Sequence, residues 1–146
     1  MTTIIYLNLE QITLYGFQKM VTDLKVDAII RGIEAGDVFP PILVRKRTGG
    51  EYELGVFRDS EDWENYGGHH RAVAHYIEGV PLRCKVWEWR SDADCEEYNE
   101  LIVPTLRFIK IEDIILKEDK GEYRIARGMY KNGLKLALTK DERRWR

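Results

Sequence analysis

The stretch YGGHHRAVAH, residues 66–75, places a glycine pair and then His69, His70 and Arg71 where a helix is expected to begin. The amino end of a helix already carries partial positive charge, so positive side chains there are disfavoured unless an anion lies opposite them. Glycine allows close approach to the backbone, and the guanidinium group of Arg71 matches phosphate oxygens. The pattern predicts a phosphate site made by Gly67, Gly68, His69, His70 and Arg71.

Two other interpretations of this stretch compete with a phosphate site. In the first, His70 and Arg71 pair with acids of the preceding segment, Asp62 or Glu64, and no ligand is needed. In the second, the histidines bind zinc. That is disfavoured because His69 and His70 diverge on a helix, and neither stands four residues from His75, which we expect on the polar face. We therefore predict no dedicated metal site.

Transfer of a phosphoryl group would require a carboxylate that orients the attacking hydroxyl or water, with Mg²⁺ bridging the phosphates. Glu34 is the candidate general base, and a solvated charge at a helix end is the alternative. His69 and His70 complete the candidate catalytic set. Asp62 and Glu64 are candidates for holding Mg²⁺.

The elements around the motif follow from local patterns. Apolar spacing predicts a helix over residues 69–78, and Gly79 and Pro81 end it. Alternation then predicts a strand over 82–87, with Cys84 packed in the core. Before the motif, two prolines lead into a β-hairpin over 42–57.

The flanking segments have weaker patterns. We expect a strand around Ile5, Leu7 and Leu9, one or two amphipathic helices over residues 17–36, a loop over 58–65 and a helix over 92–103. Beyond Pro104, strands are expected over 106–116, 123–126 and 134–138, the last with a terminal helix as alternative. These elements predict an α+β fold, a small mixed β-sheet with packed helices.

Length and composition limit the class of protein that this chain can be. With 146 residues and 44% hydrophobic residues, the chain can form an ordinary core without disulfides. No apolar run approaches the roughly 20 residues of a membrane span, and no signal peptide is recognisable at the start. We therefore expect a cytoplasmic protein without membrane contact, in which Cys84 and Cys95 are reduced.

Charge is unevenly distributed along the chain. Residues 1–104 carry a net charge of −7, whereas residues 105–146 carry +5. We accordingly predict a core domain over 1–104 and a basic extension over 105–146 that packs on the same domain. The extension would suit an anionic partner such as DNA, and a solvated basic tail is the equally simple alternative.

The order of three segments resembles the ParB/sulfiredoxin superfamily. They are FPPILV before the hairpin, GGHHRAVAHYIEG as the signature helix, and VPLRCKVWE as the following strand, and the resemblance covers roughly residues 3–90. It implies a ParB/sulfiredoxin-like fold in which Gly68, His69, His70 and Arg71 contact the phosphates of a nucleoside tri- or diphosphate with Mg²⁺.

The resemblance also separates several possible activities. Sulfiredoxins have a cysteine where this chain has His69, so sulfiredoxin activity is not expected. A free-serine kinase of the superfamily often has an aspartate where this chain has Gly67, so its catalytic mechanism does not carry over directly. A nucleotide-dependent phosphotransferase or NTPase remains open, and a DNA-associated ParB-like protein or nuclease is the alternative, although residues 105–146 lack the periodicity of a helix-turn-helix.

Overall fold

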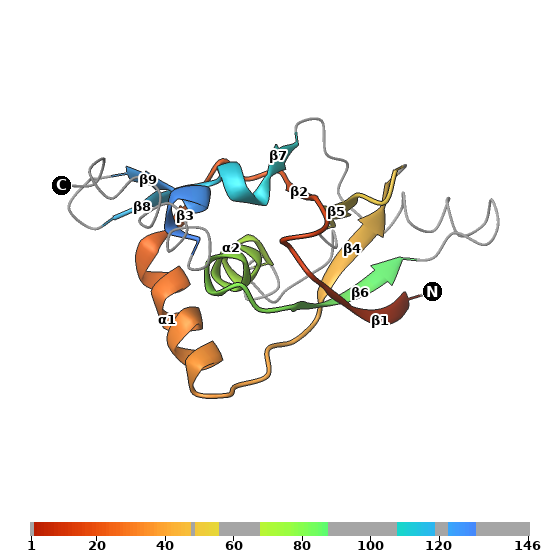
Figure 1. The fold of residues 1–146 in the computed structure, drawn as a ribbon, viewed down its shortest axis with the longest axis horizontal. Coiled ribbons are helices and arrows are strands. Elements are labelled where there is room, and N and C mark those ends of the chain that lie inside the picture. Colours follow the sequence, from red (N-terminus) through yellow and green to blue (C-terminus); the bar gives the residue numbers. More distant parts are fainter. Residues whose placement is uncertain (1, 48, 56–67, 88–107, 119–122, 131–146) are drawn as a thin grey trace.

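The computed structural model describes residues 2–47, 49–55, 68–87, 108–118 and 123–130 (Figure 1). Within these residues the fold is α+β, as predicted, with two α-helices and two mixed β-sheets. Neither helix in this part of the chain is long and apolar enough to cross a membrane.

The larger sheet has six strands in the order β1-β6-β4-β5-β2-β7. The pairs β4 with β6 and β2 with β5 are parallel, and the other neighbours are antiparallel. The strands are β1 (Thr2–Leu7), β2 (Leu14–Gly16), β4 (Ile42–Lys46), β5 (Tyr52–Leu54), β6 (Leu82–Trp87) and β7 (Ile109–Lys110).

The smaller sheet joins distant parts of the chain. Strand β3 (Met20–Thr22) pairs in parallel with β8 (Ile115–Lys117), which pairs with β9 (Tyr123–Ile125). Two short 3-10 helices, Ile111–Asp113 and Ala126–Met129, flank β8 and β9. Segments of the predicted extension therefore supply strands to both sheets, while its boundary at residue 104 stays a prediction.

Helix α2 (Gly68–Glu78) lies at the centre of the fold, between α1 (Asp23–Glu34) and the larger sheet (Figure 1). Every residue of α2 from Ala72 to Ile77 is buried, because the helix packs against α1, β6 and both 3-10 helices. The described part of the motif, residues 68–71, thus belongs to the more deeply buried of the two described helices.

The predictions that rest on strong local patterns are confirmed. The helix over 69–78, the hairpin of β4 and β5, and the strand over 82–87 with Leu82, Cys84 and Val86 buried are all present. Gly36 and Gly79 follow the two helices with φ of 85° and 68°, the left-handed conformation that ends helices readily at glycine.

Two predictions hold only in part. The helix expected within residues 17–36 is present as α1 over Asp23–Glu34, whereas Met20–Thr22 forms a strand with β8, because long-range pairing overrides local periodicity there. The expected strand over 106–116 is divided between β7, a 3-10 helix and the start of β8. The predictions for 58–65, 92–103 and 134–138 fall outside the described residues.

Candidate functional site

Gly68 begins α2 in close contact with strand β4. A Cβ atom at this position would lie 2.9 Å from Cγ2 of Ile42, a distance that real Cβ atoms do not tolerate. Packing of the helix start on the sheet therefore accounts for the glycine without a ligand. The preceding Gly67 lies beyond the part that the structure describes.

The His69 side chain is buried, with 2% of its surface exposed. Its Nε2 atom accepts hydrogen bonds from the backbone N–H groups of Phe17, at 3.0 Å, and Gln18, at 3.3 Å. The Phe17 ring packs edge-on against the His69 ring, with the ring centres 4.4 Å apart. A Cβ at Gly16 would lie 2.7 Å from the His69 ring, so that glycine makes room for it. His69 thus holds the segment between β2 and β3 against α2.

His70 joins the amino ends of the two α-helices. Its Nε2 atom accepts a hydrogen bond of 3.1 Å from the backbone N–H of Thr22, the residue that precedes α1. The neutral ring then carries its proton on Nδ1. This Nδ1 atom is buried and has no hydrogen-bond partner. Among the described residues, this N–H therefore has no acceptor.

Both histidines are neutral at pH 7. The pKa of each ring is lowered to about 4, mainly by burial. A positive charge on His70 also lowers the pKa of His69, and the positive charge of Lys25 also lowers the pKa of His70. The prediction that they add positive charge to the helix start is therefore wrong, because each ring accepts a backbone hydrogen bond instead. Lys25, which is exposed in the first turn of α1, carries a positive charge close enough to act on His70.

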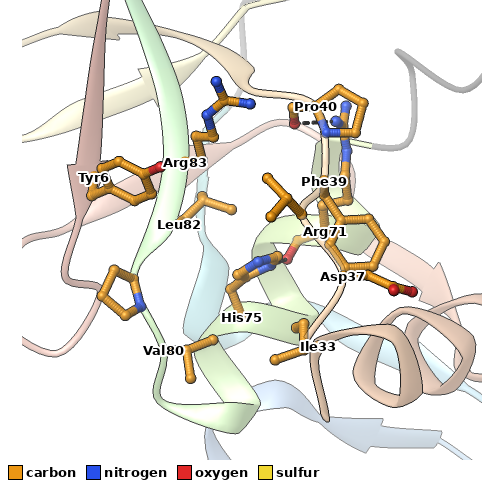
Figure 2. A pocket seen from close by; sticks show the side chains of 12 residues that line it. Tyr6, Ile33, Asp37, Phe39, Pro40, Arg71, His75, Val80, Leu82 and Arg83 are labelled. Carbon is orange, nitrogen blue, oxygen red and sulfur yellow. Dashed lines mark hydrogen bonds between the residues drawn. The ribbon is translucent and has the colours of Figure 1, made fainter. Parts of the chain in front are cut away.

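Arg71 turns away from the helix start toward the segment between α1 and β4 (Figure 2). Its side chain is 7% exposed, and NH1 donates a 2.6 Å hydrogen bond to the carbonyl oxygen of Pro40. The structure thus separates the predicted set, since Arg71, His70 and His69 reach three different segments. The alternative partners Asp62 and Glu64 are not among the described residues.

Glu34 is not brought to the motif histidines. It is exposed in the last turn of α1, whereas His70 contacts Thr22 at the opposite end of that helix. At 1.5 Å per residue these two ends are about 18 Å apart, far beyond the reach of a general base. The catalytic roles of Glu34, His69 and His70 stay predictions.

The prediction that His75 lies on the polar face of its helix is wrong. This histidine is 8% exposed and lies within 2.6 Å of the Arg71 carbonyl oxygen through Nδ1, so it is not on a polar face. Among the described residues no three histidine, cysteine or acidic side chains group together in a way that would hold a metal ion.

Both arginines of the described part of the basic extension are paired with acids, whereas Lys110 and Lys117 are exposed. Arg124 pairs with Asp23 at 3.2 Å and with Glu118, and Arg127 pairs with Asp113 at 3.2 Å. Paired cations offer less charge to a polyanion than free ones. The described residues therefore give the DNA hypothesis no specific support.

Sequence reasoning missed two residues that only the tertiary fold brings to the motif: Thr22, whose N–H binds His70, and Lys25, whose charge acts on His70. Comparison with known proteins adds no relative, since no family model, curated protein or solved structure matches the chain.

Proposed function

We propose that this chain is a ParB/sulfiredoxin-like domain that binds a phosphate ligand, a nucleotide, where the amino ends of α1 and α2 meet. One observation carries the proposal, the hydrogen bond of 3.1 Å between the Thr22 N–H and His70 Nε2. It fixes two helix amino ends side by side. Each such end carries about half a positive charge and N–H groups without intrahelical partners, so their junction favours an anion.

The side chains around the junction fit the same ligand. Thr22 makes no side-chain cap, and the first turn of α2 contains no acidic residue. Within the described residues the buried Nδ1–H of His70 has no acceptor, and a phosphate oxygen would supply one once the ring moves to meet it. Lys25 adds a full positive charge. The acid of the α1 first turn, Asp23, is paired with Arg124, so its charge is partly cancelled.

Mg²⁺ would enter with the nucleotide rather than bind beforehand. Asp23 is the carboxylate that α1 offers in its first turn, and it is held by Arg124. The described residues therefore make no separate magnesium site, and the ligand's phosphates would supply most of the metal's oxygens. Phosphotransfer or NTP hydrolysis would need a further carboxylate near the γ-phosphate, so binding is the core of the proposal.

Lys25→Glu should weaken nucleotide binding about tenfold or more, because it reverses the full charge at the junction. The measurement is thermal stabilisation by ATP, ADP, CTP and GTP with Mg²⁺, since a ligand of the native state raises its unfolding temperature. The matched control is Lys46→Glu, an exposed charge reversal on β4. The proposal fails if no nucleotide stabilises wild type, or if both variants respond as wild type does.

A further inference from the structure

A pocket of about 190 Å³ lies beside α2, on the side that Arg71 faces (Figure 2). Its walls come from the segment between α1 and β4, from α2, and from the adjoining strands β1 and β6. Its polar lining comprises Tyr6, Asp37, Arg71, His75 and Arg83. We infer that this pocket binds a small organic anion whose body is apolar, at a site separate from the helix junction.

Arg83 supplies the first argument for an anion. Its Nε atom is buried and has no hydrogen-bond partner, and no ion pair of Arg83 is found within the described chain. The charge of Arg83 is therefore not compensated by an acid of the described chain, and a carboxylate or phosphate is the group that suits a guanidinium best. Arg83 lies directly opposite Tyr6 in the register of β6 and β1.

Arg71 adds a second guanidinium group to the same lining. Its hydrogen bond to the Pro40 carbonyl fixes the orientation of the side chain. Two arginines from different elements, α2 and β6, therefore line one small cavity. Asp37, which is exposed, is the carboxylate in this lining, so the cationic groups outnumber the acidic one.

The rest of the wall is apolar or neutral, and it therefore suits a ligand whose body is apolar. Ile33, Phe39, Val80 and Leu82 line it. The Phe39 ring packs edge-on against His75, with ring centres 5.9 Å apart, and burial lowers the pKa of His75, so this wall carries no charge at neutral pH. Ligand pockets for larger molecules usually exceed about 300 Å³, so this one suits a ligand of about one ring.

The test is calorimetric titration with benzoate and with phenyl phosphate, which share a ring but differ in the acidic group, and with neutral benzyl alcohol. We expect at least one anion to bind wild type, a tenfold or greater loss in Arg83→Gln, and a change below twofold in Lys85→Gln. Lys85 lies two residues along β6 on the same face and does not line the pocket. Binding of one anion alone would identify the acidic group that the pocket accepts.

The inference is overturned if neither anion binds, if benzyl alcohol binds as tightly as they do, or if both β6 variants lose binding equally. Val80→Phe, which fills the pocket and removes no charge, should abolish binding independently of Arg83. The two sites are distinguishable, since Lys25→Glu should leave benzoate and phenyl phosphate binding unchanged, and Arg83→Gln should leave stabilisation by nucleotides unchanged.

Discussion

Replacing His69 with alanine should lower the free energy of unfolding by about 3–5 kcal/mol. The substitution removes a buried ring that packs on Phe17, and it leaves the N–H groups of Phe17 and Gln18 without their acceptor. His70→Ala should cost less, since it removes one backbone hydrogen bond from a half-buried ring. Urea unfolding of the three proteins measures both differences.

A double-mutant cycle with Gly16 isolates the contact itself. In wild type, Gly16→Ala forces a Cβ to within 2.7 Å of the His69 ring, so the substitution should destabilise the fold. In the His69→Ala background the ring is gone and Cδ1 of Ile111, at 3.3 Å, is the remaining near neighbour, so the same change should cost clearly less. A loss below about 1 kcal/mol for His69→Ala, or equal costs for Gly16→Ala in both backgrounds, would contradict the structural role.

Stability should fall as the pH is lowered from 6.5 toward 4. The pKa of His69 is about 4 in the folded protein and near 6.5 when unfolded, so in this range the unfolded chain binds a proton that the folded one excludes. Between pH 7.5 and 5, His69 alone should account for a loss of about 2 kcal/mol. His70 shifts in the same direction and adds to it.

The matched variant for this prediction is His69→Gln, which retains an acceptor for the backbone N–H groups but does not titrate. Urea unfolding at several pH values between 7.5 and 5 should give a flatter profile for the variant than for wild type. Carboxylates contribute to both proteins alike, so the difference between the profiles reports His69. Parallel profiles would show that His69 is not buried as a neutral ring.

Several parts of the fold could be predicted because their signals are local. The helix over 69–78 follows from apolar residues at i,i+4 spacing and a terminal glycine, and the strand over 82–87 from strict alternation. Both patterns depend on neighbours within a few residues. The hairpin of β4 and β5 is similarly local, since Gly49 and Gly50 adopt φ of 84° and 79° in its turn.

The surroundings of the motif could not be predicted, because they depend on residues about fifty positions away. His69 contacts Phe17, and His70 contacts Thr22, in a segment whose path is set by pairing of β3 with β8. Nothing in the sequence near the motif specifies these partners. The periodicity of residues 17–36 favours helix, and only the tertiary pairing converts Met20–Thr22 into a strand.

The thiols give no support to sulfiredoxin-type chemistry in the described chain. The position that the sequence resemblance matches to the sulfiredoxin cysteine holds the buried ring of His69. Burial also raises the pKa of Cys84 to about 12, so this side chain stays a thiol and lacks the reactive thiolate that attack on sulfur requires. Cys95 lies outside the described residues. The proposed phosphate site includes neither cysteine.

The most direct test of the central claim is a titration of the ¹⁵N-labelled protein with ATP and Mg²⁺, followed by amide chemical shifts. A phosphate at the helix junction predicts the largest changes at Asp23, Leu24 and Lys25 and at residues 68–71, because these amides begin the two helices. Saturable changes confined to those two turns would support the site. Saturable changes elsewhere, or none at all, would contradict it.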